Sequence, residues 1–88
     1  MNEREHEIGI TVIVNGQPVE MKHLNTKEIL KAVVKLALDE SGNSGQPIDN
    51  WELRDAAGQV LDLNKRIADY GITDHARLFL NLKAGVGG

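Results

Sequence analysis

Hydrophobic and polar residues alternate along two stretches near the start of the chain, IGITVIV and QPVEM. They flank Asn15-Gly16, the residue pair preferred in a two-residue type I′ hairpin turn. The alternation therefore predicts two antiparallel strands, and Pro18 marks the second as an edge strand. Thr11 and Ile13 should point away from the core. Side chains of alternate positions form the predicted core face of this hairpin: Ile8, Ile10, Val12, Val19 and Met21.

A helical period follows in NTKEILKAVVKLALDESGN. We expect Asn25 to cap this helix, with Glu28 in the reciprocal capping-box position. Gly42 should end it. Apolar residues recur at spacings of three and four, which predicts one buried stripe: Leu30, Val33, Val34, Ala37 and Leu38.

The second half of the chain returns to short strands. WELRDAAGQVLDL predicts a strand, a tight turn at 55–58 and a short strand, and RLFLNLK alternates again. NKRIADYGITDHA should form a loop or a brief 3₁₀ turn. One helix cannot cover both faces of a sheet, so we expect an α+β single layer with four to five strands. The predicted core comprises Ile10, Val12, Leu30, Val33, Val34, Leu53, Leu61, Leu78, Leu80 and Leu82.

Length and composition limit the possibilities. Eighty-eight residues form one domain, which we divide into a flexible arm (1–7), a globular body (8–83) and a flexible tail (84–88). The chain has no cysteine, which excludes its own disulfides and thiol nucleophiles. A net charge of −3 with scattered lysines argues against nucleic-acid binding. The absence of a long apolar run and the charged start MNEREHE predict a cytoplasmic protein without membrane contact.

No motif in the sequence indicates catalysis or metal binding. His6, His23 and His75 are far apart and are interpreted as surface histidines. GNSGQP lacks the lysine and hydroxyl residue that end a phosphate-binding loop, and DAAGQVLD lacks the alternating oxygen ligands of a calcium loop. We therefore expect a non-enzymatic protein with no metal and no cofactor of its own.

The segment KAGVGG follows directly on the last predicted strand and contains no large side chain after Lys83. Terminal glycines are often only frayed ends. Yet glycine has no Cβ, so the active site of another protein can close tightly around Gly87 and Gly88. A carboxylate presented in this way is a candidate substrate group.

The last part of the chain resembles ubiquitin. In IADYGITDHARLFLNLKAGVGG an Asp-Tyr-x-Ile loop (Asp69, Tyr70 and Ile72) precedes an alternating leucine strand and a diglycine tail, as in ubiquitin. The similarity covers roughly residues 51–88, and the element order fits the whole chain. It implies the β-grasp fold, with the last strand central and parallel to the first. More specifically, it implies a bacterial ubiquitin-like protein of the kind that works with activating-enzyme, conjugating-enzyme and JAB-peptidase homologues.

The resemblance also implies a mechanism. An activating enzyme would use ATP and magnesium to adenylate the carboxylate of Gly88. The acyl group would then pass through enzyme-bound intermediates to an amine on a target protein. The partner enzyme would hold Gly85, Val86 and Gly87 in a narrow channel, and a JAB-type or other peptidase would process any precursor. The chain alone is expected to be a monomer.

Two departures from ubiquitin indicate different partners. Lys83, directly before the tail, is the only basic residue in KAGVGG, whereas activating enzymes read arginines in the tail of ubiquitin. The aliphatic patch of ubiquitin is also replaced by polar residues, Arg54 and Asn81 among them. If the first and last strands are neighbours, Ile13 and Phe79 lie together on the open face beside these two residues. We predict that Ile13, Phe79, Arg54 and Asn81 form a partner-docking face.

Two other interpretations stay open. ITVIVNGQPVE resembles the start of ThiS-type sulfur carriers, which are related to MoaD-type carriers and also end in diglycine. That resemblance implies a terminal thiocarboxylate in place of a protein conjugate. Alternatively, the chain is a β-grasp interaction module whose tail has no chemical role.

Overall fold

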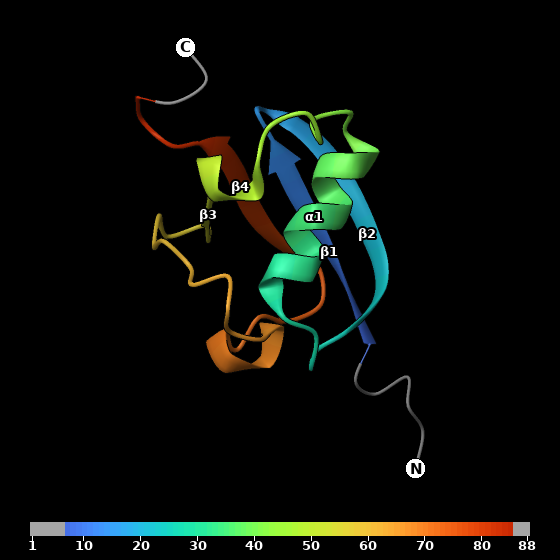
Figure 1. The fold of residues 1–88 in the computed structure, drawn as a ribbon. Helices are drawn as coiled ribbons and strands as arrows, with labels where there is room; N and C mark the ends of the chain where they lie inside the picture. The colour runs from blue at the N-terminus through green and yellow to red at the C-terminus, as the bar shows by residue number, and fades with distance from the viewer. Residues whose placement is uncertain (1–6, 86–88) are drawn as a thin grey trace.

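Four strands and one helix form the body of the protein in the computed structural model, which describes residues 7–85 (Figure 1). Residues 1–6 of the expected arm and residues 86–88 of the expected tail lie outside this part. The first strand begins at Glu7, one residue before the expected body. In chain order the elements are β1 (Glu7–Val14), β2 (Gln17–Asn25), α1 (Leu30–Glu40), the 3₁₀ turn η2 (Ile48–Asn50), β3 (Trp51–Arg54), the 3₁₀ turn η3 (Ile67–Tyr70) and β4 (Ala76–Leu82).

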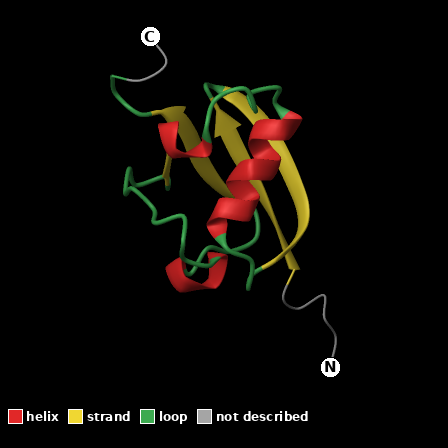
Figure 2. Cartoon of the chain, viewed as in Figure 1, coloured by secondary structure: helices red, strands yellow, loops and turns green. Residues whose placement is uncertain are grey.

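The strands form one mixed sheet in the order β2-β1-β4-β3. The pairs β1–β2 and β3–β4 are antiparallel, while β1 and β4 run parallel at the centre. The helix α1 lies diagonally across one face of this sheet (Figures 1 and 2). The predicted α+β layer and the central, parallel last strand are confirmed, and β2 is an edge strand as Pro18 indicated.

The hairpin of β1 and β2 has the predicted register. Val12 pairs with Val19, and Ile10 pairs with Met21. The turn residue Asn15 has a φ of 50° and Gly16 a φ of 84°, as a type I′ turn requires. The register then shifts between Ile8 and Ile10, which places a β-bulge near the open end of the hairpin.

The expected capping box at the start of the helix is wrong. The helix begins at Leu30, and no side chain caps it. Instead the Leu30 amide donates to the Lys65 carbonyl (2.8 Å) and the Lys31 amide to the Leu63 carbonyl (2.9 Å). Asn25 ends β2, and its side-chain oxygen accepts from the Lys27 amide in an exposed turn. The first two amides of the helix are thus satisfied by a distant loop.

The helix ends at Glu40, and Gly42 provides the predicted stop two residues later. The Gly42 amide donates to the Asp39 carbonyl (3.2 Å), and the Asn43 amide donates to the Leu38 carbonyl (2.8 Å). These two bonds form a Schellman motif, in which the residue after the helix has left-handed backbone angles. Gly42 has a φ of 75°, which glycine adopts without strain.

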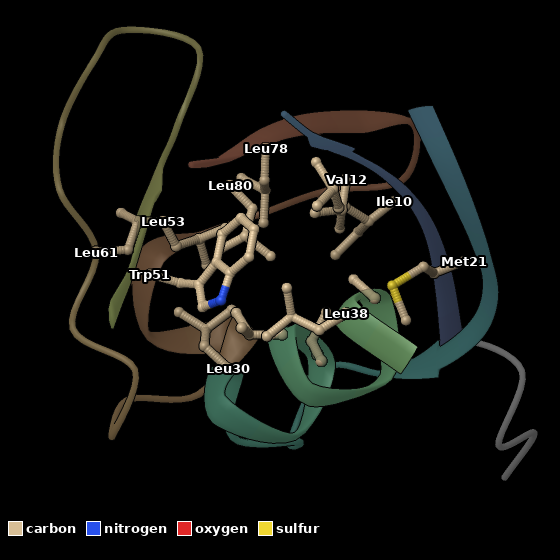
Figure 3. Close-up of a cluster of buried hydrophobic side chains, with 14 of the residues drawn as sticks. Ile10, Val12, Met21, Leu30, Leu38, Trp51, Leu53, Leu61, Leu78 and Leu80 are labelled. Atoms are coloured by element: carbon tan, nitrogen blue, oxygen red, sulfur yellow. The ribbon is translucent and has the colours of Figure 1, made fainter. Parts of the chain in front are cut away.

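The core lies between α1 and the sheet (Figure 3). Nine of the ten predicted core residues are buried, while Leu82 is half-buried against the cluster. Three further residues that were not predicted as core are 2% exposed or less: Val14, Trp51 and Ile67. The indole of Trp51 packs among aliphatic side chains, and its buried Nε1 has no hydrogen-bond partner among the described residues.

Beyond β3 the chain turns back on itself, as the sequence predicted, but the returning strand is minimal. The Asp55 amide donates to the Gln59 carbonyl (3.0 Å) and the Leu61 amide to the Leu53 carbonyl (2.8 Å). This pairing amounts to one isolated antiparallel bridge, between Arg54 and Val60, and not to a further strand. The sheet therefore has four strands, at the lower end of the expected number.

Candidate functional site

The start of the tail is attached to the end of the sheet. Leu82 pairs with Trp51, and the next amide, that of Lys83, donates to the Asn50 carbonyl (2.8 Å). Lys83, Ala84 and Gly85 are exposed, and the chain leaves the body beyond the end of β4 (Figure 1). A segment that begins on a central strand has a fixed starting point.

Of the tail residues singled out in the sequence, only Gly85 is described. Its φ of 87° lies in the region that favours glycine, and a Cβ at this position would meet no atom within 4 Å. Val86, Gly87 and Gly88 lie outside the described residues.

The Asp-Tyr-x-Ile loop holds the chain in position before β4. The Tyr70 hydroxyl oxygen accepts from the Asp62 amide (2.8 Å), and a carboxylate oxygen of Asp69 accepts from the Arg66 amide (2.8 Å). Ile72 is partly buried and packs against the core. Each of these three residues makes a contact that stabilises the fold. This part of the ubiquitin resemblance is therefore evidence for the fold and not for a chemical function.

The predicted docking residues lie side by side on the open face of the sheet. Ile13 of β1 pairs with Phe79 of β4, and Phe79 pairs on its other side with Arg54 of β3. Asn81 lies two residues along β4 and pairs with Glu52. Ile13 and Phe79 are half-buried, whereas Arg54 and Asn81 are exposed. The open face therefore has an apolar centre with a polar edge.

Arg54 is held in place at that edge. Its Nε donates to a Glu52 carboxylate oxygen (3.0 Å), and its Nη1 donates to the Gly58 carbonyl (2.8 Å). The guanidinium also forms a salt bridge with Glu52 (2.9 Å). An arginine fixed by its own strand and turn presents a preorganised polar group next to Phe79.

Two histidines that lie far apart in the sequence line the same depression in the structure. His23 and His75 both line a depression of about 690 Å³ over the hairpin bulge. There the Gly9 amide donates to Asp74 (2.7 Å), and the His75 amide donates to the Gly9 carbonyl (2.8 Å). The parallel pairing of β1 with β4 could have indicated this meeting. His6 lies outside the described residues, and within 7–85 no three His, Asp or Glu side chains are arranged to hold a metal ion.

Solved structures show which fold this architecture represents. The ubiquitin of Caldiarchaeum subterraneum superposes with a TM-score of 0.74 at 20% identity, covering 93% of this chain and 99% of that protein. A de novo designed protein based on ubiquitin gives a TM-score of 0.76 at 14% identity, covering 94% of this chain and 96% of the design. The protein therefore has the ubiquitin-like β-grasp fold.

The sequence places the chain in a family. It belongs to the family described as "Protein of Unknown function (DUF2604)", whose model matches residues 3–88. It is 45% identical over 82 residues to the protein described as "Uncharacterized protein y4jI" of the bacterium Sinorhizobium fredii (strain NBRC 101917 / NGR234). The match covers 93% of this chain but 62% of that relative. None of the helices in the described part of the chain is long and apolar enough to cross a membrane.

Proposed function

We propose that this chain is a ubiquitin-like protein modifier whose acyl donor is the carboxylate of Gly88. The observation that carries the proposal is the junction of β4 and the tail. A ubiquitin-like body ends in a central strand fixed as far as Lys83, and only small residues follow it to the glycine pair. This arrangement supports presentation of the last backbone units to the channel of a partner enzyme.

The chemistry needs activation because a carboxylate is a poor acyl donor. A Gly88 carboxylate oxygen attacks the α-phosphorus of ATP, pyrophosphate leaves, and an acyl adenylate forms. A nucleophile of the activating enzyme then displaces AMP and takes the acyl group. A conjugating-enzyme homologue transfers it to a target amine, which loses a proton as the amide forms. Where residues follow Gly88 in the gene product, a JAB-type or other peptidase exposes this carboxylate by hydrolysis.

The open face of the sheet is the proposed docking surface for these enzymes. Ile13 and Phe79 supply the apolar centre, and Arg54 and Asn81 supply polar groups around it. Aromatic residues with a polar rim often dominate binding energy. In this proposal the chain carries no catalytic residue, and ATP and magnesium bind to the activating enzyme.

Deletion of Gly88 tests the proposal. Loss of one residue moves the carboxylate back by about 3.3–3.6 Å. Misplacement by about 1 Å can already cost on the order of a hundredfold in rate. We therefore expect ATP–pyrophosphate exchange, measured with the activating-enzyme homologues of the source organism, to be lost. Unchanged exchange by the deletion variant would refute the proposal.

Mass spectrometry of the reaction product separates the two alternatives that share adenylation. A Gly88 amide linkage to protein supports the modifier. A stable thiocarboxylate would support the sulfur carrier instead, which the resemblance of the β1–β2 hairpin to ThiS-type proteins favours. If the wild-type chain supports no ATP–pyrophosphate exchange with any homologue, the remaining interpretation is an interaction module whose tail has no chemical role.

A further inference from the structure

A groove lies on the helical side of the protein, away from the open face of the sheet. It runs between α1 and the loop of residues 44–48 and has a volume of about 630 Å³. The apolar part of its lining comes from five residues of these two segments: Ile29, Ala32, Leu38, Pro47 and Ile48.

The position of Ile29 is unusual for a large aliphatic residue. Ile29 is 44% exposed at the start of α1, while the next residue, Leu30, is fully buried in the core. Single exposed hydrophobic residues are common and need no explanation. Ile29, however, lies in a concave surface where further apolar groups converge, and such surfaces are typical of binding sites.

Two lysines border the same groove. Lys31 and Lys35 are one helical turn apart on α1, and both are exposed. Among the described residues, neither forms a salt bridge, and the three that occur involve other side chains. Asp39 lines the groove one further turn along the helix. The groove is therefore positive toward the start of α1 and negative toward its end.

We propose that this groove binds an acidic segment of a partner protein. The segment inserts an apolar side chain between α1 and the loop and places carboxylates beside Lys31 and Lys35. Charge complementarity selects this occupant, because an apolar groove with two unpaired ammonium groups on its edge favours carboxylates over basic groups. Asp39 sets the orientation of the bound segment, because its carboxylate repels other carboxylates. The acidic residues of the segment therefore lie toward the start of α1. The proposal does not depend on the tail or on adenylation.

Dimensions define the probe. The helix rises about 1.5 Å per residue, so the groove from Ile29 to Asp39 is roughly 15 Å long. This length accommodates about five extended residues. A phage-displayed library of random peptides of about ten residues is therefore long enough to fill it with flanking charges. Selected peptides are then synthesised with a fluorescent label, and their dissociation constants are measured by fluorescence anisotropy.

We expect the selection to enrich peptides that combine acidic residues with an apolar anchor. Ala32→Gln fills the groove with a side chain that helices accept, and it should weaken binding by at least about tenfold. Ala57→Gln, at an exposed turn, is the control of equal size and should have no effect. Circular dichroism of both variants confirms that the fold is retained.

Charge variants test the predicted polarity. Reversal of Lys31 and Lys35 to glutamate should weaken peptide binding by about tenfold, since each exposed ion pair contributes modestly. The same reversal at Lys22 and Lys83 is the matched control. Asp39→Asn should leave binding unchanged or strengthen it. Added salt should weaken binding to the wild-type chain.

Three results would overturn the proposal. The first is a selection that yields no peptide sensitive to Ala32→Gln. The second is enrichment of neutral or basic peptides whose binding does not respond to the lysine reversals. The third is a wild-type chain that sediments as a dimer and becomes monomeric with Ala32→Gln, because a second copy would then be the occupant. Loss of ATP–pyrophosphate exchange in the Gly88 deletion has no bearing on these outcomes.

Discussion

Ile13 lies directly beside Phe79 on the open face, where β1 and β4 run parallel at the centre of the sheet. Neither side chain is fully covered, although their chain neighbours Val12, Val14, Leu78 and Leu80 are buried on the opposite face. The same two strands thus supply the core on one side and an apolar pair on the other. This division allows the proposed docking face to be changed without changing the core.

Phe79→Ala should weaken binding to an activating or conjugating partner while the thermal midpoint stays nearly constant. The aromatic ring contributes contact area to a partner. Its removal leaves no cavity in the core because the ring points to the open face. Binding by isothermal titration calorimetry and unfolding by circular dichroism are the paired measurements. A collapse of the midpoint would show that Phe79 is needed for the fold and would remove it from the docking face.

Leu80→Ala changes the next residue on β4 and should have the opposite effect. Leu80 is fully buried, so truncation should lower the free energy of unfolding by roughly 2–5 kcal/mol. That is a large part of the stability of a domain of this size. Urea denaturation measures the change, and Leu36→Ala, which truncates a 46% exposed leucine, is the control. Equal costs at the two positions would contradict the assignment of the core.

Glu28→Ala tests the start of the helix. A capping box would make this substitution cost about 1 kcal/mol. In the structure the first helical amides donate to the Lys65 and Leu63 carbonyls, so the free energy of unfolding should change by less than about 0.5 kcal/mol.

Gly42→Ala provides the contrast at the other end of the helix. Its left-handed backbone makes a Cβ unfavourable by about 1–2 kcal/mol. If Glu28→Ala lowers the free energy of unfolding as much as Gly42→Ala does, the Glu28 side chain does cap the helix.

The sequence predicted those parts of the fold that depend on local pattern. The Asn15-Gly16 turn fixed the hairpin register, because a two-residue type I′ turn permits only one closing pair. The start of α1 could not be predicted in this way, since its amides are satisfied by carbonyls that lie far along the chain. Ile67 was missed as a core residue because a single apolar residue beside polar neighbours has no periodicity to detect. Trp51 was also missed, although it alternates with Leu53 in the strand WELR, and this period of two could have indicated its burial.

Of the two candidate surfaces, one could be predicted from the sequence and the other could not. The neighbourhood of Ile13 and Phe79 followed from a parallel arrangement of the first and last strands, which the ubiquitin resemblance implied. The groove beside α1 depends on where the loop of residues 44–48 lies, and a loop that contains Gly45 and Pro47 does not specify its path in a pattern of hydrophobicity. Lys31 and Lys35 could be placed on one helix face but not beside an apolar groove.

Gly87→Leu is the sharpest test of the proposed tail function. If a partner enzyme closes around the last backbone units, a leucine side chain cannot enter the channel, and ATP–pyrophosphate exchange should be lost. The carboxylate itself stays at the same distance from β4, so this variant separates steric exclusion from the displacement caused by deleting Gly88. Gly87 lies beyond the predicted body, so the free energy of unfolding should shift by less than about 0.5 kcal/mol.

Gly45→Leu serves as the matched control for this substitution. A Cβ at Gly45 would meet no atom within 4 Å, and its φ is not in the left-handed region. The variant should therefore fold normally and keep full exchange activity. Normal exchange by Gly87→Leu would show that no narrow channel reads the tail, even if Gly88 is adenylated. Loss of exchange in both variants would instead point to a general effect of an added leucine, and the difference between the two is the quantity that decides the question.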